Sequence, residues 1–220
     1  MSAVSASAEV GHKLVSPFLD LLPIDGVALS VLGQDHKASL IHASDATAAR
    51  LEEIHFDLGE GPMFDCYRTA DPVLVADAAT TDRWPLFSAS ASGVDAAGYF
   101  VFPLSMGAAC VGAVLCYRTI AGALDSAAVE TGTALGRSMA GPAFRQAILA
   151  AGEEDVDDAS PIEMRREVHQ ATGMLLYQMD ITATEAFVRM RAYAFAHGIS
   201  LRQVAHDVVT REFDFTGLTD

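Results

Sequence analysis

The chain has 220 residues, of which 51% are apolar, and a formal net charge of −15. This length accommodates two domains of ordinary size, and the apolar fraction favours packed cores over general disorder. No run of about 18 uncharged apolar residues is present, and the N-terminus lacks the basic start and apolar segment of a signal peptide. We therefore expect a cytoplasmic protein with no membrane partner. The three cysteines match neither a disulfide framework nor a metal-ligand pattern.

The negative charge is unevenly distributed along the chain. Residues 1–150 carry 8 Lys and Arg against 16 Asp and Glu, residues 151–160 carry five acids and no base, and residues 161–213 carry six Arg and six acids. The run of like charges predicts a solvated acidic linker at 151–160, between a domain at 1–150 and a domain at 161–213, with a tail at 214–220. The neutral second domain is free to bind an anion such as RNA.

Strand-like and helix-like patterns alternate in residues 1–150, after an amphipathic N-terminal helix. The predicted strands are 25–32, 38–43, 73–76, 97–104 and 109–117, and the later predicted helices are 45–54 and 124–150. Antiparallel strand pairs with helices at both ends predict an α+β domain whose helices cover one face of an antiparallel sheet. The last helix is apolar nearly all round, so we expect a partner to cover it, in a homodimer.

Five motifs in this domain occur in the order typical of GAF domains from actinobacterial signalling proteins. They are GEGP at Gly59–Pro62, DPVLVAD at Asp71–Asp77, RWPLF at Arg83–Phe87, FPL at Phe102–Leu104 and VGAVLCYR at Val111–Arg118. Residues from about 10 to 148 resemble this family, although Met63 stands where relatives commonly carry cysteine. The resemblance implies a small-molecule-sensing domain, and we expect its ligand pocket to include Asp77, Trp84, Phe100 and Phe102.

Three helices are predicted in residues 161–213, each opened by a capping box, at Ser160–Glu163, Thr182–Glu185 and Ser200–Gln203. Gly198 falls where a left-handed residue would end the second helix. Apolar residues then follow the helical period and predict an all-α three-helix bundle. They are Met164, Val168, Ala171, Leu175 and Met179, then Ala183, Phe187, Met190 and Ala194, then Leu201, Val204, Ala205 and Val208.

The segment Glu167–Val209 closely resembles the ANTAR domain, an RNA-binding output module of transcription antiterminators that recognises paired hairpins as a dimer. The family's Ala-x-Gly step is present as Ala171-Thr172-Gly173, with Thr172 where lysine is frequent. GAF followed by ANTAR is itself a known arrangement. The resemblance, together with the anion affinity of helix N-termini and arginine, implies an RNA-facing set. We expect it to comprise Gln170, Thr172, Gly173, Arg191 and Arg202.

These observations predict a sensor-coupled transcription antiterminator with no catalytic residues, no metal and no cofactor. An alternative is a GAF-fold ligand or redox protein, resembling free-methionine sulfoxide reductases, with a helical dimerisation module. Cys110 and Cys116 would share one face of a regular strand, but roughly 20 Å apart. His42 and His55 have no second metal ligand at useful spacing. A DNA-binding helix-turn-helix is a weaker third hypothesis, because Arg202 and Arg211 are the only basic residues of the third predicted helix.

Overall fold

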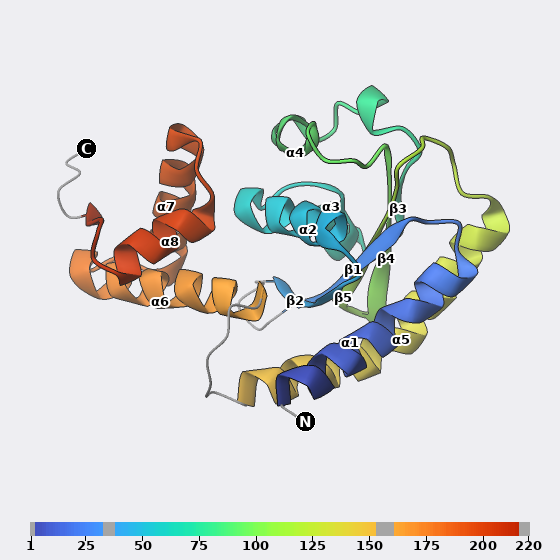
Figure 1. The fold of residues 1–220 in the computed structure, drawn as a ribbon, viewed down its shortest axis with the longest axis horizontal. Coiled ribbons are helices and arrows are strands. Elements are labelled where there is room, and N and C mark those ends of the chain that lie inside the picture. The colour runs from blue at the N-terminus through green and yellow to red at the C-terminus, as the bar shows by residue number, and fades with distance from the viewer. Residues whose placement is uncertain (1–2, 33–37, 153–160, 216–220) are drawn as a thin grey trace. The chain divides into compact units, whose positions relative to one another are not determined.

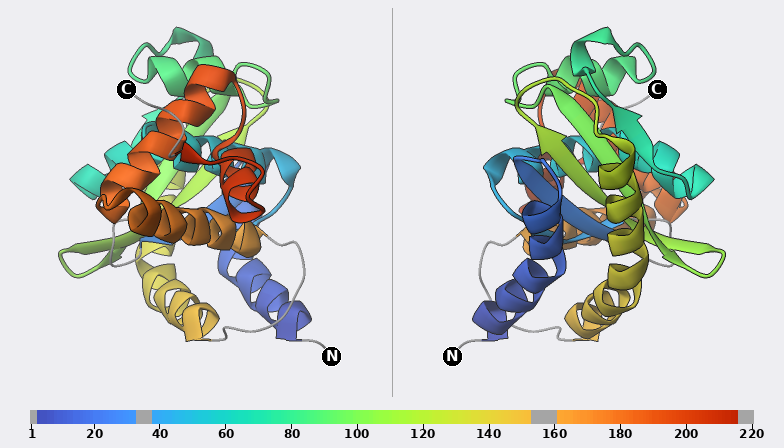
Figure 2. Two further views of the ribbon diagram at one scale, coloured as in Figure 1. Left: turned by 90° about the vertical axis from the view of Figure 1, so that its left-hand side faces the viewer. Right: turned by 90° about the vertical axis from the view of Figure 1, so that its right-hand side faces the viewer.

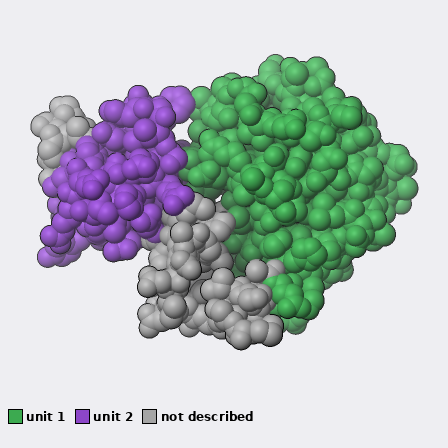
Figure 3. Space-filling view, viewed as in Figure 1, with its two compact units in different colours: residues 1–155 green, residues 156–220 purple. Residues whose placement is uncertain are grey.

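A computed structural model describes residues 3–32, 38–152 and 161–215 of the chain. The chain divides into two compact units, Met1–Asp155 and Val156–Asp220, shown in green and purple in Figure 3. This division falls within the segment predicted as the acidic linker. Its residues 153–160 lie outside the described residues, so each unit is described by itself. None of the described helices is long and apolar enough to cross a membrane.

Unit 1 contains a five-stranded antiparallel sheet in the order β2-β1-β5-β4-β3 (Figure 1). Its strands are β1 (Gly26–Leu32), β2 (Ala38–Ala43), β3 (Val73–Val75), β4 (Gly98–Met106) and β5 (Ala109–Arg118). Its α-helices are α1 (Ala3–Leu21), α2 (Ala46–Leu58), α3 (Pro62–Thr69), α4 (Pro85–Ala91) and α5 (Ser126–Gly152), and a short 3₁₀ helix, η1, covers Ala78–Thr80.

The sheet separates two apolar clusters, because successive side chains of a strand point to opposite faces. Val101 and Leu115 pack on the face covered by α2, α3 and α4. Phe102 and Val114 pack on the face covered by α1 and α5, which lie on the same side of the sheet in both views of Figure 2. Helices therefore cover both faces of the sheet, not one as predicted. Burial on both faces explains why β4 and β5 are continuous apolar runs.

Helix α5 lies close against β4 because two of its residues have no side chain. A Cβ at Gly136 would come within 2.5 Å of the carbonyl oxygen of Pro103, and a Cβ at Gly132 would overlap the ring of Phe102. Such contacts are too short for real atoms, so only glycine lets the helix backbone approach the strand this closely. Pro142 lies farther along α5 and cannot donate the backbone hydrogen bond of an ordinary helical residue.

Unit 2 is a three-helix bundle formed by α6 (Pro161–Met179), α7 (Ala183–His197) and α8 (Leu201–Val209) (Figure 1). The capping box at α7 is confirmed, since Thr182 Oγ1 accepts from the Glu185 amide and Glu185 Oε2 accepts from the Thr182 amide. Gly198 has φ +64° and ends α7 as predicted. Ser200 caps α8, but the side chain of Gln203 donates to Asp207. Ser160 of the first predicted box lies outside the described residues.

The core of unit 2 agrees with the predicted apolar period at Val168, Ala171 and Leu175 of α6 and throughout α8, but not throughout α7. Of the other predicted α6 residues, Met179 is half-buried and the side chain of Met164 lies outside the described residues. Ala186, rather than the predicted Ala183, is buried with Met190 and Ala194. Beyond α8 the chain turns back, and buried Phe215 packs edge-on against Tyr193 with ring centroids 5.4 Å apart. The first residues of the predicted tail therefore belong to the bundle. The core residues of unit 2 are Val168, Ala171, Leu175, Ala186, Met190, Ala194, Leu201, Val204, Ala205, Val208 and Phe215.

We predict that Gly136→Ala lowers the free energy of unfolding of unit 1, although alanine is the better helix former. The added methyl group meets backbone that cannot move aside, and such overpacking costs about 1–3 kcal/mol. Trp84 is the only tryptophan and lies in unit 1, so its fluorescence during urea unfolding reports on this unit. Ala134→Gly, at an exposed position of the same helix, is the control and should cost only about 0.5–1 kcal/mol. A Gly136→Ala protein as stable as the wild type would contradict the proposed close approach.

Candidate functional site

The GEGP segment joins α2, α3 and α4 through its backbone and one carboxylate. Gly59 has φ +62° and ends α2, and Pro62 begins α3. Between them, Glu60 Oε1 accepts hydrogen bonds from the amides of Leu86 and Phe87, each at 3.0 Å. These amides belong to the first turn of α4 and have no partner within that helix. Glu60 therefore acts as a remote cap that holds the start of α4 beside α2 and α3.

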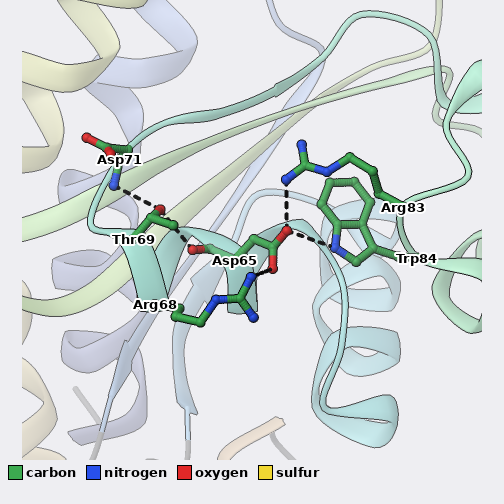
Figure 4. A network of polar contacts seen from close by, with 6 residues as sticks. All are labelled: Asp65, Arg68, Thr69, Asp71, Arg83 and Trp84. Carbon is green, nitrogen blue, oxygen red and sulfur yellow. Dashed lines mark hydrogen bonds and ion pairs between the residues drawn. The ribbon is translucent and has the colours of Figure 1, made fainter.

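A second carboxylate, Asp65 of α3, fixes the segment just before α4 (Figure 4). Its oxygens accept from Arg68 Nη2 at 2.6 Å, from Arg83 Nη2 at 2.8 Å and from Trp84 Nε1 at 3.1 Å. The guanidinium of Arg83 also lies 4.4 Å from the ring centroid of Trp84, as in a cation–π contact. The RWPLF motif is thus held by Asp65 at its start and by Glu60 at its end.

The buried imidazole of His55 lies beneath this segment. Its Nδ1 donates to the carbonyl of Leu51 at 2.7 Å, and its ring is 4.2 Å from that of Phe87. Its Nε2 is buried and has no hydrogen-bond partner among the described residues. Burial lowers the pKa of His55 to about 3, against a smaller opposing effect of the Leu51 hydrogen bond. The ring is therefore neutral near pH 7 and presents one bare acceptor nitrogen.

The predicted pocket residues do not form one group. Trp84 belongs to the cluster beneath α2, α3 and α4, whereas Phe100 and Phe102 point to the opposite face, beneath α1 and α5. Asp77 caps η1 by accepting from the amide of Ala79 at 3.0 Å. The prediction of a common pocket is wrong, because the sheet lies between its aromatic members. Sequence patterns did not single out His55 as a pocket residue, and only its buried, unpartnered nitrogen does so here.

The three thiols are buried or half-buried and are held in their protonated form. Burial raises the pKa of Cys66 and Cys116, and the nearby Cys110 thiol raises that of Cys66 further. Burial also raises the pKa of Cys110, opposed by a hydrogen bond to the carbonyl of Gly112. Cys116 packs beneath α1 and α5, whereas a β-bulge turns Cys110 toward Cys66. Cys110 and Cys116 therefore do not share a face as predicted.

In unit 2, two residues of the predicted RNA-facing set lie on one face of α6. Gln170 and Gly173 are both exposed and lie one turn apart. Thr172 is only 3% exposed, and its hydroxyl donates to the carbonyl of Val168 at 2.6 Å. It shares the core-facing side of α6 with Val168 and Leu175. Its predicted contact with RNA is therefore wrong, because a side chain on this side of the helix faces the bundle interior.

The two predicted arginines come from different helices, Arg191 from α7 and Arg202 from the first turn of α8. Arg191 is half-buried and Arg202 is exposed. Neither guanidinium forms a hydrogen bond or an ion pair within the described part of the chain, and the side-chain amide of Gln170 is equally unengaged. His206, one turn after Arg202, is instead paired with Glu167 of α6 at 2.9 Å, and this hydrogen bond raises the pKa of His206.

Tyr177, which was not among the predicted residues, is 88% exposed near the end of α6. Its spacing of four residues from Gly173 places the two on one helix face, and this spacing is the signal that could have identified it.

Comparisons with known proteins agree with the division into two units. The model of the ANTAR domain family matches residues 160–209. No curated protein sequence matches the chain closely enough to be a relative. Unit 1 is similar to solved structures at a level of identity that establishes the fold alone.

Three of these structures illustrate the likeness. A type II free methionine-R-sulfoxide reductase from Thermoplasma acidophilum has a TM-score of 0.52 and 15% identity, over 64% of this chain and 94% of its own. The GAF domain region of a Geobacter sulfurreducens protein, described as a membrane protein, has a TM-score of 0.51 and 13% identity, over 66% and 99%. A domain of a protein described as a Sinorhizobium meliloti two-component sensor histidine kinase has a TM-score of 0.50 and 13% identity, over 70% and 100%.

Unit 1 thus has counterparts in fold among solved structures, and residues 160–209 of unit 2 match a known family. Residues 160–209 are an ANTAR domain, and they follow a unit with the fold of GAF domains.

Proposed function

We propose that this protein is a cytoplasmic, signal-responsive transcription antiterminator. Its ANTAR domain would bind paired hairpins in nascent RNA under the control of a ligand bound by the GAF-fold unit. The observation that carries this proposal is the set of donors on the ANTAR domain, from Gln170, Arg191 and Arg202, that form no hydrogen bond or ion pair with any residue that the structure describes. Residues 161–213 carry no net charge within a chain of net charge −15, so RNA phosphates meet the least repulsion there.

The side of unit 1 beneath α4 is the better candidate for the ligand. The bare Nε2 of His55 would accept a hydrogen bond from a small molecule that carries an N–H or O–H group. The segment above it, residues 83–87, is held by side-chain contacts of Glu60 and Asp65. A ligand that changed these contacts would change the position of α4.

A thiol-based reductase activity receives less support. Thiolate is the reactive form of cysteine, and burial keeps Cys66, Cys110 and Cys116 protonated near pH 7. ANTAR and GAF domains are regulatory and sensor modules, which agrees with a protein that acts by binding.

The end of α5 supports the proposal of a homodimer. Leu135 and Met139, expected to require a partner, already pack beside α1 and the sheet. Phe144 and Ile148 lie one turn apart farther along the helix and remain exposed, Ile148 by 57%. A second copy would remove this apolar surface from water. We propose that the helices bounding unit 1, together with the ANTAR bundle, form the dimer contact.

We expect Arg191→Ala and Arg202→Ala each to weaken RNA binding while the far-ultraviolet helix signal stays unchanged. A lost charge-assisted hydrogen bond costs about 1.5–3 kcal/mol, or roughly ten- to a hundredfold in affinity. The RNA is first obtained by sequencing what co-purifies with the full chain, and its affinity is then titrated at several salt concentrations. Arg189→Ala, an exposed arginine on α7, controls for net charge. Unchanged affinity in both test variants would contradict the assignment, and preference for duplex DNA would favour a helix-turn-helix.

We expect light scattering at tens of micromolar to give about twice the chain mass of 23.2 kDa. Phe144→Asp with Ile148→Glu should shift the mass toward one copy, because a charge in an apolar contact cannot be desolvated without large cost. Leu86→Glu changes an exposed leucine on α4 and should leave the mass unchanged. A wild-type monomer at this concentration would rule out the proposed contact.

The acidic linker is expected to inhibit RNA binding by repelling phosphate. Replacing Glu153, Glu154, Asp155, Asp157 and Asp158 with Gln and Asn should tighten RNA binding. The gain should be largest near 0.01 M salt, where charges act over about 30 Å, and small near 1 M, where they act over about 3 Å. Equal affinities of the neutral variant and the wild type at every salt concentration would make the linker a passive tether.

A further inference from the structure

The most exposed large apolar side chain in the described part of the chain is Tyr177 of α6, at 88%. An aromatic ring gains more than most side chains from leaving water, so a ring left this exposed has no function in the packing of its own unit. Single exposed apolar residues are common on protein surfaces. Tyr177 alone would therefore indicate nothing, but its neighbour on the helix also lacks an explanation within the chain.

That neighbour is Gly173, one turn earlier on α6. Glycine in a helix interior is less stable than alanine and is ordinarily retained for a left-handed backbone or a close approach. Neither reason applies within this chain, since Gly173 has no positive φ and a Cβ built on it would find no heavy atom within 4 Å. By contrast, Gly132 and Gly136 of α5 each face an atom that a Cβ would strike. No contact within the described chain accounts for Gly173. Gly141 of α5 is equally open, so Gly173 supports an inference only together with the exposed Tyr177 on the same face.

Gln170, Gly173 and Tyr177 follow one another along one face of α6, at helical spacings of three and four residues. This face is opposite the side that carries Val168 and Leu175 into the core. A side-chain amide, a stretch of bare backbone and a phenol ring thus line one open strip, which is named the α6 strip below. Residues 168–179 contain no Asp or Glu, and the nearest acids along the chain are Glu167 and Asp180 at the two ends of this stretch.

The chemistry of the α6 strip fits an unpaired nucleic-acid base better than a protein surface. A base has a flat face that stacks on an aromatic ring and a polar edge that an amide such as Gln170 can both donate to and accept from. A stable protein contact needs about 800 Å² on each partner and a mainly apolar centre. Besides Tyr177, the strip and its exposed flanks include Leu176 but also Gln170, Gln178 and Asp180, which is too polar for such a centre.

We propose that Tyr177 stacks on one unpaired base of a hairpin loop, that the loop passes over the bare backbone at Gly173, and that Gln170 contacts the edge of the base. This inference rests on the proposed function, because it names the part of the RNA that the ANTAR domain reads. The arginines would then bind phosphates, and Tyr177 would make RNA recognition depend on a loop base. The occupant of the α6 strip is an RNA loop, not a second copy of the chain.

The test uses the full chain and a synthetic copy of the two-hairpin RNA that co-purifies with it. Tyr177→Ala should weaken binding about tenfold, as loss of one stacked base does, while Tyr177→Phe should remain within about twofold of wild type. Phe195→Ala, which removes a ring 63% exposed on α7, is the matched control and should have no effect. Gly173→Ala should weaken binding while raising the thermal midpoint of unit 2 by about 4–8 °C, since it improves the helix without striking another atom.

A second arm replaces each loop nucleotide in turn with an abasic one. Tyr177→Ala should cause no further loss of affinity for the RNA variant that lacks the stacked base, because the stacking contact is already absent in that complex. Tyr177→Ala should also leave the salt dependence of binding unchanged, since it removes no phosphate contact.

The outcomes separate this inference from the proposed function. If the wild-type chain binds no hairpin RNA, the proposed function fails and this inference with it. If the wild type binds and Tyr177→Ala binds equally well, or if Phe195→Ala weakens binding as much, the inference alone is overturned. A Tyr177→Ala protein that loses dimer mass in light scattering, with RNA affinity unchanged at a matched oligomeric state, would assign the α6 strip to a second copy.

Discussion

The contact between the backbone of α5 and strand β4 constrains the whole of unit 1. At Gly132 and Gly136 the helix has no side chain to hold it away from Phe102 and Pro103. The backbone of α5 therefore packs directly against β4. A contact of this kind has no flexible atoms to absorb a displacement. A shift of β4 must therefore move α5 or break the contact. Because α5 is also the last element before the segment that leads to the ANTAR domain, the contact joins the sheet to the output side of the chain.

The opposite face of the sheet is built differently. There the start of α4 is held by side chains, through the carboxylates of Glu60 and Asp65, and the neutral ring of His55 lies beneath it. Side-chain hydrogen bonds can be exchanged for others at modest net cost, whereas the glycine contact of α5 cannot. One face of the sheet is thus held by exchangeable side-chain hydrogen bonds, and the other by a contact between backbones.

Sequence patterns predicted the regular elements well. Every strand of unit 1 was predicted within two residues of its observed bounds, because strands buried on both faces form long apolar runs bounded by turn residues. Helices α3 and α4 were missed because each covers only about two turns, too few for an apolar period to be visible. Both begin with a proline, at Pro62 and Pro85, which was the available signal.

The candidate sites were harder to predict than the fold, for two different reasons. Phe100 and Phe102 were grouped with Trp84 by residue type, but pocket membership depends on the face of the sheet, and that depends on register. Thr172 was assigned by its place in a motif, although its spacing of four from Val168 already indicated the core side of the helix. Gln170 and Gly173 were placed on the exposed side of α6. Motif position thus selects a helix, but the helical period decides which residues on that helix are exposed.

Pro142 divides α5 into two stretches with different mechanical properties. The ring nitrogen of Pro142 carries no hydrogen, so it cannot donate to the carbonyl of Ser138. The helix therefore lacks one backbone hydrogen bond at this point. A helix bends most readily where its hydrogen-bond ladder is interrupted. The stretch before Pro142 lies on β4, whereas the stretch after it carries the exposed Phe144 and Ile148. Ala143, directly after Pro142, is still buried in the cluster beneath α1 and α5, so the interruption in the backbone hydrogen bonds lies where the helix is still packed on unit 1.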